Sequence, residues 1–157
     1  MANLTLYIDL YPGGMTVCTG DSLRQHTPWQ TVVIDEADLT APDKGISSFV
    51  QALGVCASTL DLSRCRDAVI LLDATQICFR QVTLPFSNKK KIRQVLPFEL
   101  APHLPGDNQD MVIDFIPLDL DHVADGQTLL CAAVPALLIQ DLALGLQRYK
   151  IRIMRET

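Results

Sequence analysis

This sequence has no long hydrophobic run and no leader pattern. Its longest apolar stretch, residues 129–144, is interrupted by Pro135, Gln140 and Asp141, and a helix that crosses a bilayer needs roughly 20 apolar residues. The N-terminus, MANLTLYIDL, lacks the basic segment followed by an apolar segment that marks a signal peptide. We therefore expect the chain to stay in the cytoplasm unless a partner holds it at a membrane.

The sequence also lacks the motifs that mark common metal sites and catalytic centres. Its 5 cysteines include no C-x-x-C pair and its 3 histidines are scattered, so we expect structural cysteines and no bound metal. A Walker-type loop, a G-x-S-x-G and an H-E-x-x-H are missing. The formal net charge of −5 argues against a nucleic-acid-binding protein. We predict no catalytic residues, no cofactor and no nucleic-acid partner.

What the sequence does have is the composition of one globular domain. Of its 157 residues, 48% are hydrophobic and 20% are charged, so the chain can bury a sizeable core. No internal repeat and no low-complexity linker divides it. We therefore expect residues 1–157 to form a single domain.

The N-terminal half begins with strands. Residues 4–10 are rich in β-branched and aromatic side chains, and the turn sequence Tyr11-Pro12-Gly13-Gly14 leads into a second strand at residues 15–19. These two strands therefore predict a hairpin. Three further elements follow, namely a strand at residues 29–35, an amphipathic helix at 46–53 and a buried strand at 68–72.

Prolines divide the C-terminal half. Pro85 ends a strand at residues 76–84, because proline has no N–H for a strand ladder. Ser87 or Asn88 caps the next helix, which Pro97 interrupts, so we expect a kink or a fresh helical turn there. The remaining elements are strands at residues 111–118 and 127–134, a helix from residue 135, and a strand at 150–154. The last strand, helix and strand predict a parallel crossover unit.

One segment of the C-terminal half resembles a known family. Residues 79–105, FRQVTLPFSNKKKIRQVLPFELAPHLP, form a strand ending in TLPF, a charged helix, and P-F-E-L before another proline. This pattern, with an arginine at Arg80 in the strand, a V-x-D-F strand from Val112 to Phe115, and AAVP at residues 132–135, is similar to the actin-like GspL and PilM proteins of type II secretion and type IV pilus systems. The resemblance extends over residues 68–154.

The resemblance implies a fold and a function. The expected fold is an α/β ribonuclease H-like (actin-like ATPase) unit, with a mixed sheet, flanking helices and a small subdomain inserted at residues 76–118. The strand at residues 4–10 is expected at the centre of the sheet, and the chain is expected to be the first part of a longer protein. The side chains expected to be buried are Ile8, Ile70, Leu72, Leu130 and Ala132.

The function implied by the resemblance is a non-catalytic cytoplasmic scaffold of a type II secretion or type IV pilus system. Such a scaffold would lie at the cytoplasmic face of the inner membrane. Its expected partners are the cytoplasmic secretion or pilus ATPase, an inner-membrane assembly protein and a second copy of the chain. The alternative is an ATP-binding actin-like or sugar-kinase-like enzyme or switch.

The alternative depends on the first hairpin, which is the candidate cofactor site. Actin-like ATPases hold phosphate with a hairpin of the type D-x-G-[ST]-x-x-[IV]-[KR], and the matching residues here are Asp9, Gly13, Gly14 and Thr16. The basic residue and the G-[ST] pair of that motif are missing. A tight turn also needs glycine for a positive φ whether or not a ligand binds, so an ordinary hairpin is favoured.

The candidate partner-binding residues are Arg80, Pro85, Phe86 and Phe98. The prolines beside the two phenylalanines hold them in fixed positions, as an interaction surface requires. An aromatic side chain next to a proline also commonly packs its own loop against the core, and this alternative stays open. The basic run that precedes Phe98, residues 89–93, offers a lipid-binding patch or, as is usual for such runs, a solvated helix face.

Overall fold

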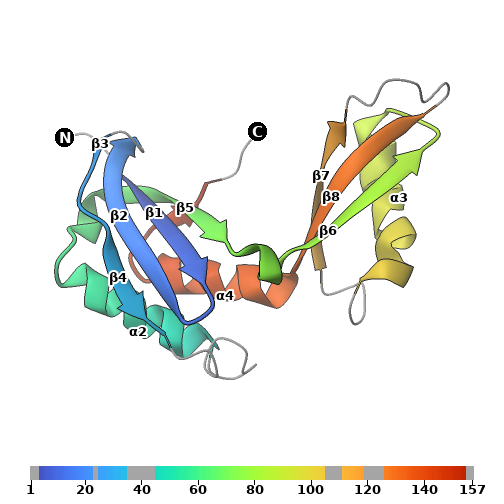
Figure 1. The fold of residues 1–157 in the computed structure, drawn as a ribbon. Coiled ribbons are helices and arrows are strands. Elements are labelled where there is room, and N and C mark those ends of the chain that lie inside the picture. Colours follow the sequence, from blue (N-terminus) through green and yellow to red (C-terminus); the bar gives the residue numbers. More distant parts are fainter. Residues whose placement is uncertain (1–3, 23–24, 35–44, 105–110, 119–125, 155–157) are drawn as a thin grey trace. The chain divides into compact units, whose positions relative to one another are not determined.

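The computed structural model describes residues 4–22, 25–34, 45–104, 111–118 and 126–154. The chain divides into two compact units, one made of Met1–Asp73 and Gln140–Thr157 and the other of Ala74–Ile139. We call them the large-sheet unit and the small-sheet unit (Figure 1). None of the helices in the described residues is both long enough and apolar enough to span a bilayer.

The large-sheet unit contains a mixed β-sheet with β1 inside it. The order of the main path is β3-β2-β1-β5-β9, and β4 also pairs with β2. β1 is antiparallel to β2 and parallel to β5, and β5 is parallel to β9. The mixed sheet and the central position of the first strand are as predicted. The strands are β1 (Leu4–Tyr11), β2 (Gly14–Ser22), β3 (Gln25–His26), β4 (Gln30–Val33), β5 (Cys65–Leu72) and β9 (Arg152–Ile153).

Helices cover one face of the large sheet. Every second residue of β1 points to this face, and Leu6, Ile8 and Leu10 are fully or almost fully buried there. The helices α2 (Gly45–Ala57) and α4 (Ala136–Gln147) lie on this side of the sheet and contribute further buried side chains to the core (Figure 1). They touch at Gly145, where an added Cβ would lie 2.8 Å from the Phe49 ring.

The small-sheet unit contains a three-stranded antiparallel sheet and one helix. Its strands are β6 (Cys78–Leu84), β7 (Met111–Leu118) and β8 (Gln127–Pro135), in the order β6-β8-β7. The helix α3 (Lys89–Leu100) lies along one face. Its buried residues Ile92, Leu96 and Leu100 complete a core with the strand residues Leu84, Leu129, Cys131 and Ala133.

Two residues, Asn88 at the start of α3 and Pro97 in its interior, were singled out in the sequence. At its start, the Asn88 side chain accepts hydrogen bonds from the backbone N–H groups of Lys90 and Lys91, at 3.0 and 3.1 Å, which confirms the predicted cap. Pro97 lies inside the helix, and the helix continues unbroken to Leu100. Of the two alternatives predicted at Pro97, the fresh turn is absent, because Leu96 and Leu100 are both anchored in the core and keep the last turn helical despite the missing N–H; the kink stays a prediction.

One expectation about strand placement was wrong. The strand predicted at residues 127–134 does not form a crossover with the last strand, because β8 belongs to the small sheet and β9 to the large one. Long-range pairing decides which sheet a strand joins, and β8 pairs with both β6 and β7 over its length. The insertion at residues 76–118 stays a prediction in that form, because the compact unit Ala74–Ile139 also contains β8.

The predicted core was only partly right. Ile8 is fully buried, whereas the other four residues of the predicted set are half-buried. Ile70 and Leu72 lie in the part of β5 that extends beyond β9, since β9 pairs only with Asp67 and Ala68. The remaining two, Leu130 and Ala132, lie on the face of the small sheet that α3 does not cover.

Candidate functional site

The hairpin between β1 and β2 owes its glycines to backbone geometry and packing. Pro12 and Gly13 are the central residues of the turn, and Gly13 has a φ of 86°. Proline followed by a residue with positive φ is typical of a type II turn. At Gly14 an added Cβ would lie 2.9 Å from the Val32 carbonyl oxygen and 3.0 Å from the Tyr11 hydroxyl. Both glycines therefore have structural causes that require no ligand.

The polar residues of this hairpin contact one another. Asp9 and Thr16 are directly opposite in the antiparallel register. The Thr16 hydroxyl lies 3.2 Å from the Thr31 hydroxyl and 3.4 Å from the Tyr11 hydroxyl. Residues 4–22 contain no lysine or arginine, so the hairpin brings no cation to a phosphate. ATP binding by Asp9, Gly13, Gly14 and Thr16 therefore gains no support from this geometry.

The cysteines have the properties of core residues. All five are free, and four of them are buried. Burial raises the pKa of the Cys18, Cys56 and Cys131 thiols, and it raises that of Cys65, with help from the Asp61 charge, to about 11. Such thiols stay protonated and unreactive near neutral pH. The described part of the chain holds no group of three or more His, Cys, Asp or Glu that could bind a metal ion.

The predicted partner residue Arg80 is engaged with its own unit. Its guanidinium donates a hydrogen bond to the Phe79 carbonyl oxygen at 2.8 Å and a longer one, 3.5 Å, to the His103 carbonyl oxygen. His103 belongs to the short 3-10 helix Ala101–His103, which follows α3. Arg80 therefore links the free edge of β6 to the end of α3.

The other predicted partner residues do not meet in one place. Phe86 is half-buried and packs against the core of the small-sheet unit, whereas Phe98 is 78% exposed. Phe98 lies on the side of α3 opposite its buried stripe. Phe86 precedes α3, whereas Phe98 lies in its last turn, about 14 Å along the helix axis from the first residue of the helix. Pro85 is exposed, and Phe98 is the only aromatic of the predicted set displayed to solvent.

The sequence-based prediction missed an apolar surface on the small sheet. Alternate residues of its strands point away from α3, and we call this side the outer face. Phe79 is 44% exposed, Val112 is 48% exposed and Ile116 is 58% exposed. The central apolar residues of the outer face are Phe79, Val112, Ile116, Leu130, Ala132 and Val134.

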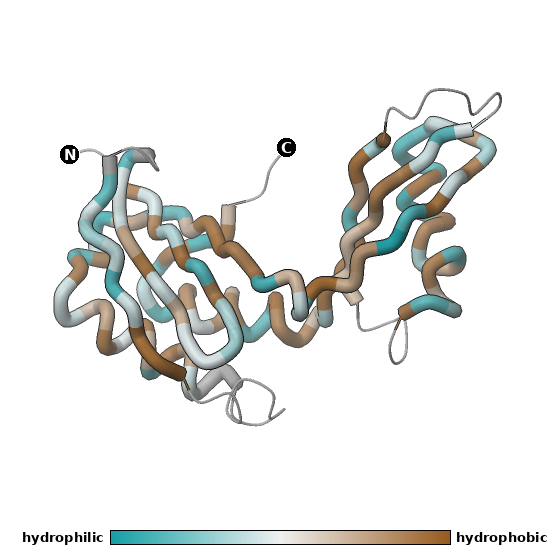
Figure 2. The backbone as a smooth tube through the Cα atoms, in the orientation of Figure 1, coloured by the Kyte–Doolittle hydropathy of each residue, from teal (hydrophilic) through white to brown (hydrophobic). Residues whose placement is uncertain are grey.

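A signal for this surface is present in the sequence. Residues 129–134, LLCAAV, are apolar at every position, and Figure 2 shows hydrophobic residues in succession along β8. A strand with one face in water normally alternates apolar and polar residues, while a continuous run is typical of a strand covered on both faces. In the described residues of the small-sheet unit, α3 covers only the inner face.

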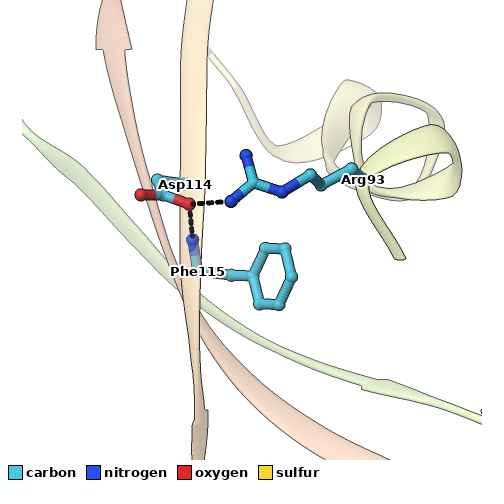
Figure 3. A network of polar contacts seen from close by, with 3 residues as sticks. All are labelled: Arg93, Asp114 and Phe115. Carbon is cyan, nitrogen blue, oxygen red and sulfur yellow. Dashed lines mark hydrogen bonds and ion pairs between the residues drawn. The ribbon is translucent and has the colours of Figure 1, made fainter. Parts of the chain in front are cut away.

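The free edge of β7 is occupied by a side-chain network (Figure 3). The Asp114 carboxylate oxygen Oδ1 accepts a hydrogen bond from the Phe115 backbone N–H at 2.9 Å. Arg93 reaches over from α3, with its Nη2 3.6 Å from the same oxygen. The Arg93 guanidinium also lies over the Phe115 ring, 5.6 Å from its centroid. An N–H that a strand edge would otherwise offer to another chain is therefore already bonded.

Comparisons with known proteins identify the fold. No protein-family profile matches the chain, and no curated protein matches it in sequence. Solved structures do match it. The cytoplasmic domain of EpsL, an inner-membrane component of the type II secretion system of Vibrio cholerae, has a TM-score of 0.62 and 15% identity over 97% of this chain. A PilM–PilN type IV pilus biogenesis complex has a TM-score of 0.74 and 13% identity over 96%.

The chain has an actin-like fold. A third matching structure, from Bacteroides thetaiotaomicron, is described as an actin-like ATPase fold of unknown function, with a TM-score of 0.51 and 10% identity over 96% of this chain. The predicted resemblance to the GspL and PilM proteins is thus confirmed at the level of the fold. The chain spans about half of the length of these structures, 56%, 46% and 51% respectively.

Proposed function

We propose that this protein is a cytoplasmic scaffold of a bacterial type II secretion or type IV pilus system. The observation that carries the proposal is the outer face, an apolar sheet surface in a unit whose fold matches the EpsL and PilM structures. Contiguous exposed apolar surface on a soluble protein commonly marks an interaction site. The protein acts by holding partners together and catalyses no reaction.

The proposed partners are the secretion or pilus ATPase and an inner-membrane assembly protein. One matching structure is itself a complex, that of PilM with PilN, which supports a partner of the second kind. Another is the cytoplasmic domain of an inner-membrane component, which supports a place at the cytoplasmic face of that membrane. Of the predicted partner residues, the exposed Phe98 remains a candidate contact, while Arg80 and Phe86 contribute to the unit's own structure.

A binding measurement tests the scaffold function. The full-length protein is immobilised, and the ATPase and the inner-membrane assembly protein of the same gene cluster are titrated over it separately. We expect saturable binding of at least one of them at micromolar concentration, the range of transient assembly interfaces of modest size. An unrelated ATPase is the control. No binding of either cognate protein would contradict the proposed function.

A further inference from the structure

We propose that the outer face of the small sheet receives an amphipathic helix of a partner protein, which packs flat across the strands and carries a basic residue beside its apolar stripe. This inference rests on the proposed function and specifies the contact through which the scaffold acts. Three observations support it: the state of the sheet edges, the shape of the outer face, and the position of its single charge.

Parts of both edges of the small sheet are obstructed against an added strand. In β7, Phe115 and Pro117 have the same orientation, facing away from β8. The Phe115 N–H is bonded to Asp114, and Pro117 has no N–H. In β6, the Phe79 carbonyl is occupied by Arg80. Natural sheets prevent edge-to-edge pairing with such devices, which disfavours an added strand at these positions and favours a partner on the face of the sheet.

The outer face has the dimensions of one helix. Neighbouring strands are spaced by about 4.8 Å, so three strands are roughly 10 Å across between the outer two, which is also the approximate diameter of a helix with its side chains. The inner face shows the same match, because the 12-residue α3 supplies the helix that covers it. A second helix of similar length would cover the outer face in the same way.

The centre of the outer face carries a small side chain, Ala132, which disfavours a second copy of this chain as the partner. Ala132 lies in the middle strand, in register with Phe79 on one side and Asp114 on the other. Residues near the axis of a two-fold dimer meet their own copies, so two stacked β8 strands would place Ala132 against Ala132 and leave a void. A large side chain from a partner helix fills this position.

Asp114 is the reason for expecting a basic residue on the partner helix. It is the only ionisable residue among the side chains of β6, β7 and β8 that point to the outer face. Its side chain is 73% exposed, and its pairing with Arg93 at 3.6 Å is exposed as well. Ion pairs of this kind contribute little to stability, so the carboxylate is able to pair with a lysine or arginine of an approaching helix.

Site-directed photo-crosslinking locates the contact. A photoreactive phenylalanine analogue is placed at Ile116 on the outer face or, as the comparison, at Phe98 on the outer side of α3, in the full-length protein. The probes are the cognate ATPase and the inner-membrane assembly protein. We expect crosslinks from Ile116 to a partner segment that is amphipathic, helical by circular dichroism as a synthetic peptide, and basic beside its apolar stripe. Three results would overturn the inference: crosslinks from Phe98 alone, crosslinks from Ile116 to an extended partner segment, or crosslinks from Ile116 to a second copy of the chain.

Matched substitutions measure how much the outer face contributes. Ile116→Gln is expected to weaken partner binding by about tenfold, as for a central apolar contact. Leu144→Gln changes a residue of similar exposure in α4, 53% against 58%, and is expected to alter binding less than about twofold. Equal effects of the two variants would overturn the inference. The melting temperature of each variant verifies that it remains folded.

Asp114→Asn separates charge from structure. The asparagine oxygen can still accept the Phe115 N–H, so this hydrogen bond is kept while the charge is removed. We expect weaker binding at low ionic strength and a smaller dependence on salt than in the unsubstituted protein. An unchanged salt dependence would contradict the basic residue on the partner. If neither partner binds the unsubstituted protein, the proposed function fails; if a partner binds and these variants have no effect, only this inference fails.

Discussion

The two units differ most clearly in their central strands. In β1, Leu6, Ile8 and Leu10 are buried on one face, while Thr5, Tyr7 and Asp9 occupy the other, so hydrophobic and polar or amphipathic residues alternate. In β8, residues 129–134 are apolar on both faces. One helix layer is enough for a strand of the first kind, whereas a strand of the second kind leaves apolar surface uncovered. This comparison supports the proposal that the small sheet carries an interaction surface.

Removing a core side chain from either unit tests whether the units are stabilised separately. Ile8→Ala in the large sheet and Leu129→Ala in the small sheet each delete a fully buried side chain, and each is expected to lower the free energy of unfolding by about 2–5 kcal/mol. Hydrogen exchange followed by mass spectrometry reports each unit by itself. We expect each substitution to reduce protection mainly in its own unit; equal loss in both would show a single cooperative structure.

A glycine pair tests the packing of helices in the large-sheet unit. Gly145→Ala places a Cβ 2.8 Å from the Phe49 ring, and such overpacking is expected to cost about 1–3 kcal/mol. Gly54→Ala adds a Cβ whose nearest neighbour is the Tyr149 hydroxyl at 3.8 Å, so it is expected to stabilise the helix by up to about 1 kcal/mol. Urea denaturation measures both. A neutral Gly145→Ala would show that the contact between α2 and α4 is loose.

Substitutions of two phenylalanines distinguish a core position from a surface position in the small-sheet unit. Phe86→Ala removes a half-buried ring that packs against the core and is expected to lower the free energy of unfolding by about 1–3 kcal/mol. Phe98→Ala removes a ring that is 78% exposed, and a change within about 0.5 kcal/mol is expected. Thermal unfolding of the two variants provides the measurement. A large loss of stability for Phe98→Ala would remove Phe98 from the candidate contacts.

The Cys65 thiol adds a pH dependence to the large-sheet unit. Its pKa is raised to about 11 in the folded protein, above the value of about 8.5 of an unperturbed cysteine. The unfolded chain therefore loses this proton first as the pH rises, so stability decreases between about pH 8.5 and 11. We expect Cys65→Ala to reduce that decrease, measured by urea denaturation at pH 8 and pH 10.5. The same pH dependence in both proteins would assign it to other groups.

The smallest expected effect concerns ATP. Because the hairpin of the large-sheet unit has no lysine or arginine, calorimetric titration with ATP and magnesium is expected to give no saturable binding. Binding that Thr16→Ala abolishes would instead support the actin-like or sugar-kinase-like alternative. It would also indicate that the functional surface lies on the large sheet instead of the small one.

Local chemistry made several parts of the structure predictable. The cap at Asn88 and the turn at Pro12-Gly13 follow from the hydrogen-bonding and backbone preferences of single residues. The β-branched and aromatic side chains of residues 4–10 predicted a strand, and Ile8 is buried as expected. The resemblance of residues 79–105 to GspL and PilM proteins led to the actin-like fold, which the solved structures confirm.

The sequence by itself determined most of the strands and helices, because these depend on residues close together in the chain, while several boundaries differ by a few residues and the short β3 was not predicted. The tertiary structure alone decided that β8 joins β6 and β7, since an apolar run such as 129–134 fits any sheet that offers partners. It also decided that Arg93 of α3 meets Asp114 of β7, whose carboxylate accepts the Phe115 N–H at the strand edge. The outer face became a candidate site only when the structure placed α3 on the opposite side of the sheet, because exposure depends on which surfaces the rest of the chain covers.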